Sequence, residues 1–167
     1  MIILGVDPGL DYCGYGLIRW HGVAPSLLEA GVIRPGRPSE PLERRLVTLD
    51  SNLSELLEEY RPDALALEQL YSHYGHPITA VLMGHARGVI CVAAGRAGVP
   101  VHSYSATQIK HCLTGAGRAS KEQMQRAIQA RLRLKSLPRP SDVADALATA
   151  LCHGLISQSP LARAATS

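Results

Sequence analysis

Four acidic residues stand where packing and solubility give little reason for them. Asp7 and Glu68 each end an apolar run, and Asp142 and Asp145 lie in an otherwise basic half of the chain. Carboxylate oxygens without sulfur or clustered imidazole nearby are ligands that Mg²⁺ and Mn²⁺ prefer. A basic surface beside them suits a polyanion. The four acids therefore indicate a divalent-metal site acting on a polyanionic substrate.

Asp7 and Glu68 are expected at the ends of two strands. Residues 1–6 form a short β-branched apolar run that stops at the breaker Pro8-Gly9, and residues 63–67 repeat this layout before Glu68. If the two strands are parallel neighbours, both carboxylates project from the carboxyl edge, where open α/β sheets bind their ligands. Taken alone, either acid would also fit a turn or a cap.

Asp142 and Asp145 are expected in the first turns of a helix. The helix follows the stop signal 138–140, and Ser141 is a good candidate for its N-cap. Spacing i, i+3 puts both aspartates on one side, where two like charges raise each other's proton affinity unless a cation lies between them. Asp142 alone would suit the helix dipole. Asp145 is harder to explain structurally, because it borders the apolar face.

The positive charge is concentrated in the second half of the chain. Residues 1–68 contain six Lys or Arg and eleven Asp or Glu, whereas residues 69–167 contain eleven and three. One segment of this half carries eight cations against Glu122 alone: Lys110, Arg118, Lys121, Arg126, Arg131, Arg133, Lys135 and Arg139. These eight residues, the basic strip, suit a phosphate backbone, although a solvated helix face has the same composition.

Lys121 follows Ser120, which forms a plausible capping box with Gln123. A cation in the first turn of a helix opposes the helix dipole. The position is easier to understand if a phosphate binds there, so Lys121 is a candidate for phosphate contact.

The remaining patterns predict an α/β fold with a mixed five-stranded sheet flanked by helices. Residues 14–20 and 26–34 extend the first strand into an antiparallel meander, and residues 99–103 form the last strand. The predicted order is β-β-β-α-β-α-β-α-α, with helices over 42–60 and about 77–97. We expect one domain, residues 1–157, followed by a flexible tail, residues 158–167.

Cellular context can also be predicted from composition. The four cysteines are far apart and include no CxxC pair, which disfavours zinc and a disulfide framework and is typical of a reducing cytoplasm. The one long apolar stretch, residues 78–98, contains His85, Arg87 and Arg96 and is therefore not expected to span a membrane.

Four short blocks in order resemble the successive motifs of the RuvC-type Holliday junction resolvases. They are residues 5–9 (GVDPG), 66–69 (ALEQ), 84–88 (GHARG) and 142–148 (DVADALA). The resemblance covers about residues 2–157. It implies a ribonuclease H-like fold, a homodimer, four carboxylates that use divalent metal to cut four-way DNA junctions, and a RuvA–RuvB branch-migration complex as partner.

In-line hydrolysis of a phosphodiester needs an activated water and a stabilised leaving oxygen, which two cations about 3.5–4 Å apart can supply together. Asp7 is the candidate for the bridging ligand, Glu68 for the nucleophile side, and Asp142 and Asp145 for the rest of the shell. We expect paired nicks in strands of like polarity, leaving 5′-phosphate and 3′-hydroxyl ends.

The resemblance also implies DNA contacts outside the carboxylates. Tyr71 falls where the resolvases carry an aromatic residue that wedges into the junction core, often Phe, and its ring can still stack on bases. Lys110 and Lys121 match basic positions near the resolvase site. Arg118, just before Lys121, is a further candidate for DNA binding.

Small residues in the helix predicted over about 77–97 would let another helix approach closely. Ala80, Gly84 and Gly88 recur every four residues. Packing within one chain would explain this spacing equally well, and the family resemblance favours a twofold dimer, whose two sites would nick two strands.

Three other functions fit parts of the sequence. A nucleotide-binding module of the actin and sugar-kinase class also opens with a strand, Asp and Gly, but needs a second domain for which 167 residues leave no room. A ribonuclease H-like nuclease acting on RNA–DNA hybrids shares the carboxylates. A non-catalytic junction-binding protein is the third, although all four acids are present.

Overall fold

The computed structural model describes residues 1–22, 24–69 and 77–159. These residues form five strands and five helices in the order β-β-β-α-β-α-β-α-α-α. The strands are β1 (Ile2–Asp7), β2 (Cys13–His21), β3 (Ala24–Ile33), β4 (Ala64–Glu68) and β5 (Val101–Tyr104). The helices are α1 (Leu42–Tyr60), α2 (Pro77–Arg96), α3 (Ala106–Thr114), α4 (Lys121–Leu132) and α5 (Ser141–Ser157).

The sheet is mixed, in the order β3-β2-β1-β4-β5. β1, β2 and β3 form the predicted antiparallel meander, while β4 lies parallel to β1, and β5 lies parallel to β4. β1 is therefore the central strand, with an antiparallel neighbour on one side and a parallel neighbour on the other. The prediction of a five-stranded mixed sheet flanked by helices is confirmed.

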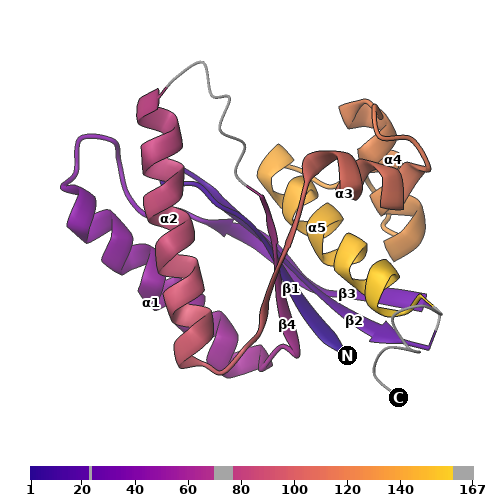
Figure 1. The fold of residues 1–167 in the computed structure, drawn as a ribbon, viewed down its shortest axis with the longest axis horizontal. Coiled ribbons are helices and arrows are strands. Elements are labelled where there is room, and N and C mark those ends of the chain that lie inside the picture. Colours follow the sequence, from indigo (N-terminus) through magenta and orange to yellow (C-terminus); the bar gives the residue numbers. More distant parts are fainter. Residues whose placement is uncertain (23, 70–76, 160–167) are drawn as a thin grey trace.

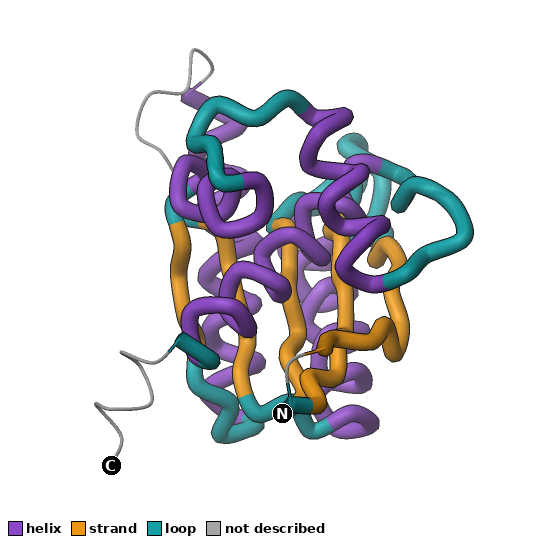
Figure 2. The backbone as a smooth tube through the Cα atoms, turned by 90° about the vertical axis from the view of Figure 1, so that its right-hand side faces the viewer, coloured by secondary structure: helices purple, strands orange, loops and turns teal. Residues whose placement is uncertain are grey.

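Helices cover both faces of the sheet (Figure 1). α1 and α2 lie side by side on one face, and α3, α4 and α5 lie on the other; Figure 2 shows the strands standing between the two layers. Alternate residues of β1 separate into the two cores: Ile3 packs with α5, whereas Leu4 and Val6 pack with α1 and α2. This period of two is what a strand buried on both faces requires.

Glycines in the first two strands allow α5 to lie directly on the sheet. A Cβ atom at Gly5 would stand 2.1 Å from the main-chain oxygen of Ala146, and one at Gly14 would stand 2.1 Å from that of Asp142. No real side chain fits at such distances. Gly14 pairs with Asp7 across β1 and β2, so this close approach brings the first turn of α5 to the end of β1.

By length and apolar composition alone, the α2 segment Ile78–Arg96 could cross a membrane, a test that core helices of folded domains also pass. Its inner face packs into the core through Ala86, Ile90, Ala93 and Ala94. Arg87, which the sequence gives as a reason against a membrane span, bonds to the main chain of β4 and to β5. These contacts make α2 a layer of the domain.

Two details of the predicted helices are wrong. Three helices follow β5 rather than two, because α3 was not anticipated. Ser141 is not the N-cap of α5 but its first residue: Pro140 is the N-cap, and its carbonyl accepts the bond from the Ala144 amide that closes the first turn. The Ser120–Gln123 capping box of α4 is confirmed.

Candidate active site

Asp7 and Glu68 lie at the same edge of the sheet, as the sequence predicts. Each is the last residue of its strand, and the parallel register pairs Val6 of β1 with Leu67 of β4. The carboxyl ends of the two strands therefore meet. Both acids are half-buried, whereas every residue before them in β4 and Ile3–Val6 of β1 are buried.

The first turns of α5 bring the other two acids to this edge. Asp142 is half-buried and its main chain lies against Gly14. From Val143 to Gly154, α5 is buried at every position except Asp145, which is exposed. A helix so apolar on all sides is a core helix. Asp145, the one exposed position of this buried span, lines a cavity together with Glu68 at the sheet edge.

Burial and neighbouring carboxylates raise the pKa of Asp7, Glu68 and Asp145. Burial, together with the charges of Asp145, Asp142 and Glu68, raises the pKa of Asp7 to about 7. Burial and the charge of Asp145 raise the pKa of Glu68. Although Asp145 reaches solvent, the surrounding protein displaces part of its hydration and raises its pKa, against the lowering effect of Lys121 and Lys110. Mutual repulsion of this kind requires the carboxylates to be close.

Two cavities adjoin the four acids. A cavity of about 290 Å³ is lined by Glu68 and Asp145 together with Lys110 and Lys121. A second cavity, of about 370 Å³, is lined by Asp7 and Asp142. Two carboxylates and two lysines thus share the first cavity, an arrangement suited to a phosphate ester.

The oxygen donors fit a hard divalent cation. Four carboxylates without sulfur ligands are the donor set of Mg²⁺ or Mn²⁺. Within the described ranges, no three His, Cys, Asp or Glu side chains form a ready-made metal cluster.

Arg87 holds the end of β4 in place at this site, a role that was not predicted from the sequence. Its guanidinium donates one hydrogen bond of 2.6 Å to the main-chain oxygen of Glu68 and another of 2.6 Å to Ser103 Oγ. The side chain therefore ties α2 to the ends of β4 and β5. Arg87 lies in the quoted 84–88 block, but only the tertiary structure reveals its partners.

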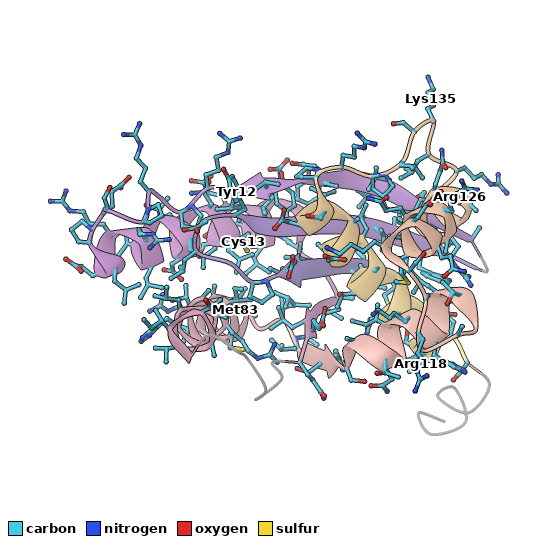
Figure 3. All side chains as sticks on the ribbon, turned by 90° about the horizontal axis from the view of Figure 1, so that it is seen from above. Tyr12, Cys13, Met83, Arg118, Arg126 and Lys135 are labelled. Atoms are coloured by element: carbon cyan, nitrogen blue, oxygen red, sulfur yellow. The ribbon has the colours of Figure 1, made fainter. Side chains whose placement is uncertain are left out.

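The basic strip is divided by the structure. Arg118, Arg126 and Lys135 reach outward around α3 and α4 (Figure 3). Arg126 pairs with Glu122 at 2.6 Å, and Arg131 donates to the Leu113 oxygen at the end of α3. Lys110 is half-buried and Lys121 exposed. Tyr71, the predicted aromatic wedge, lies outside the described residues.

An acidic edge on a mixed sheet, with α5 packed on its central strand, defines the ribonuclease H-like class of metal-dependent nucleases. Residues 3–153 match the family described as crossover junction endodeoxyribonuclease RuvC. The member from Rhodopirellula baltica is 50% identical over 162 residues, 97% of this chain and 90% of that protein. The member from Petrotoga mobilis is 44% identical over 92% of this chain and 93% of its own.

Solved structures agree with the sequence match. Thermus thermophilus RuvC, solved in complex with a Holliday junction substrate, superposes with a TM-score of 0.90 at 37% identity, covering 95% of each chain. The chain belongs to the RuvC family of crossover junction endodeoxyribonucleases. Membership makes it a nuclease hydrolase and implies dependence on a divalent metal.

Proposed function

We propose that this chain resolves four-way DNA junctions by metal-dependent hydrolysis of phosphodiesters, with paired nicks in strands of like polarity. The observation that carries the proposal is the convergence of Asp7, Glu68 and Asp145 at one sheet edge, beside a cavity that Lys110 and Lys121 also line. The junction-bound relative from Thermus thermophilus supports the choice of substrate.

Asp7, Glu68, Asp142 and Asp145 would hold two Mg²⁺ or Mn²⁺ ions, with Asp7 between them. When bound, the cations would acidify the attacking water and stabilise the leaving oxygen. The central position of Asp7 supports its bridging role, because the charges of the other three acids all act on it.

The cationic residues would position the DNA. Lys110 and Lys121 face the carboxylates across the cavity and would contact the phosphate next to the cut. Arg118 is exposed on the connection between α3 and α4 and would bind the backbone further along. Tyr71 would stack on a base of the junction core, at about 1–3 kcal/mol per base.

Paired nicking requires two sites, and we assign the dimer contact to α2. A surface hollow of about 430 Å³ between α1 and α2 is lined by Leu46, Val47, Gly84, Gly88, Val89 and Val92, with His85 and the Asp50–Arg96 ion pair. Val47 is 65% exposed and Val92 50%. We call this hollow the α2 patch; apolar surface of this kind favours association with a second copy.

The domain would comprise residues 1–157, with a tail from 158 that lies mostly outside the described residues. We place the enzyme in the cytoplasm with the cell's DNA, where a RuvA–RuvB branch-migration complex would deliver junctions to it.

A comparison of three substrates tests the proposed function. A synthetic four-way junction, a linear duplex and an RNA–DNA hybrid are incubated with Mg²⁺ and with EDTA. We expect symmetric nicks in the junction alone and only with Mg²⁺. Preferential cleavage of the hybrid would favour the other ribonuclease H-like activity, and binding without any cleavage would favour a non-catalytic junction-binding protein.

A further inference from the structure

Tyr12 stands beside the acidic site on an anchored loop. It is 54% exposed, although the large apolar ring of a tyrosine usually packs in a core or an interface. Its neighbour Asp11 accepts a bond of 2.7 Å from Arg45, whose side chain is only 5% exposed. Gly9 permits the tight turn, since a Cβ atom there would lie 2.0 Å from the Tyr12 main-chain oxygen. The loop therefore holds an aromatic ring in solvent.

Arg34 covers part of this ring. Its guanidinium carbon lies 5.7 Å from the centre of the Tyr12 ring, within the range of a cation–π contact. Tyr12 directly precedes β2 and Arg34 directly follows β3, and the pairing of Cys13 with Ile33 brings the two residues together. An exposed ring backed by an arginine is a platform on which a base can stack.

Tyr12 and Asp11 line two cavities at once. One is the cavity of about 370 Å³ that contains Asp7 and Asp142. The other, of about 450 Å³, is lined also by Arg34 and Arg37. Tyr12 thus lies between a cavity that contains the proposed metal ligands Asp7 and Asp142 and one that contains Arg34 and Arg37.

The acids of the outer cavity already have partners. Asp11 accepts the bond from Arg45, and Glu40 Oε1 accepts one of 2.9 Å from the Arg37 amide. Their charges therefore oppose a bound anion less than their number suggests. In Figure 3, Tyr12 and Met83, which share the inner cavity, lie to the left and Arg118 to the right.

We propose that Tyr12 and Arg34 form a second DNA contact, in which a base of the substrate stacks on the Tyr12 ring and a neighbouring phosphate binds Arg34. This inference rests on the proposed function. The DNA would then cross the carboxylates, bound by Lys110 and Lys121 on one side and by Tyr12 on the other. Contacts on both sides of the cleavage site would fix the position of the scissile phosphate.

The test compares Tyr12→Ala, Tyr12→Phe and Arg34→Ala in the full chain. The probes are a four-way junction and junctions carrying the fluorescent base 2-aminopurine at successive positions beside the nick. Arg19→Ala is the matched charge control, because Arg19 is exposed and pairs with Ile2 at the opposite edge of the sheet. Junction affinity is measured with EDTA present, and melting temperature reports the fold.

We expect Tyr12→Ala to weaken junction binding roughly 5- to 150-fold and to restore 2-aminopurine fluorescence at one position. Tyr12→Phe keeps the ring and should keep both the affinity and the quenching. Arg34→Ala should weaken binding and reduce the slope of log affinity against log salt by about 1. Arg19→Ala should bind like the wild type.

Wild-type affinity and quenching in Tyr12→Ala would overturn the contact, as would a defect in Tyr12→Phe equal to that of Tyr12→Ala. If Tyr12→Ala misfolds, a normal salt slope and affinity in folded Arg34→Ala overturn it instead. These outcomes are separate from failure of the proposed function, which would appear as a wild-type protein that does not nick the junction.

Discussion

The guanidinium of Arg87 donates a hydrogen bond of 2.6 Å to the main-chain oxygen of Glu68, at the point where β4 ends. A second bond, to Ser103 Oγ, fixes the same guanidinium to β5. Arg87 therefore positions a proposed metal ligand without being one. The arrangement connects α2, the proposed dimer helix, to the carboxylates.

Arg87→Ala should lower the rate of junction nicking roughly 10- to 100-fold, the usual loss when a group that orients a metal ligand is removed. Single-turnover nicking across a Mg²⁺ titration measures it, and the Mg²⁺ requirement should shift upward while junction affinity in EDTA is retained. Arg44→Ala, at an exposed position on α1, is the control. An unchanged Mg²⁺ requirement in Arg87→Ala would mean that Glu68 needs no such support.

The raised pKa of Asp7 should make the metal-free protein less stable as pH rises. The folded state keeps the Asp7 proton up to a pKa of about 7, whereas the unfolded chain releases it near 3.8. Between these values the folded state binds more protons, so the free energy of unfolding falls with pH. The upper bound is about 4 kcal/mol, from about 1.4 kcal/mol per pH unit.

Thermal unfolding in EDTA from pH 4 to pH 8, with wild type and Asp7→Asn, measures this effect. Asn carries no charge at any pH, so Asp7→Asn should flatten the decline and be the more stable protein at pH 8. Mg²⁺ should stabilise the wild type more at pH 8 than at pH 5, because cation binding competes with the proton. Parallel pH curves for the two proteins would contradict the assigned burial of Asp7.

Gly14→Ala should displace the acids of α5, although Gly14 is not itself a site residue. The added Cβ atom would stand 2.1 Å from the main-chain oxygen of Asp142. The first turn of α5 must therefore move away from β2. We expect a loss of about 1–3 kcal/mol in stability. A displacement of the acids by about 1 Å would lower nicking by roughly 100-fold.

Gly95→Ala is the matched control for that substitution. A Cβ atom at Gly95 meets nothing within 4 Å, and the position lies in α2, so alanine should stabilise the protein by roughly 0.5–1 kcal/mol. Denaturant unfolding and single-turnover nicking give both quantities. Wild-type nicking by Gly14→Ala would show that α5 can shift without disturbing the carboxylates.

Much of this architecture follows from the sequence because it depends on local patterns. The apolar runs that end at Asp7 and Glu68 predict both strands, and the parallel pairing of β1 and β4 brings their ends together. α3 escaped prediction because it is only nine residues long with two buried residues, Ile109 and Leu113. Its capping box, Ser105 with Gln108, was a usable signal.

The contacts that support the site could not be predicted in the same way. Arg87 meets Glu68 across 19 residues of sequence, and Arg45 meets Asp11 across 34. Such pairs depend on how helices pack against the sheet, which residue spacing does not encode. The roles of the four carboxylates, of Lys110, Lys121 and Arg118, and of Tyr71 stay predictions.

Val92→Glu should separate the proposed dimer. Val92 is 50% exposed in the single chain, so the fold should tolerate a charge there, whereas a buried dimer contact should not. Light scattering should give a dimer for the wild type and a monomer for the variant, with similar melting temperatures. Leu27→Glu, at an exposed position on β3, should remain dimeric. A monomeric wild type at working concentration would contradict a dimer contact at the α2 patch.

Asp145→Asn tests the proposed metal nuclease site most directly. The substitution keeps the size of the side chain and removes one charge from the only exposed position within the buried span of α5. The decisive measurement is single-turnover nicking of a synthetic four-way junction in Mg²⁺, with junction affinity determined in parallel. We expect affinity close to that of the wild type and no detectable nicking; full nicking by Asp145→Asn would contradict a site in which the four carboxylates act together.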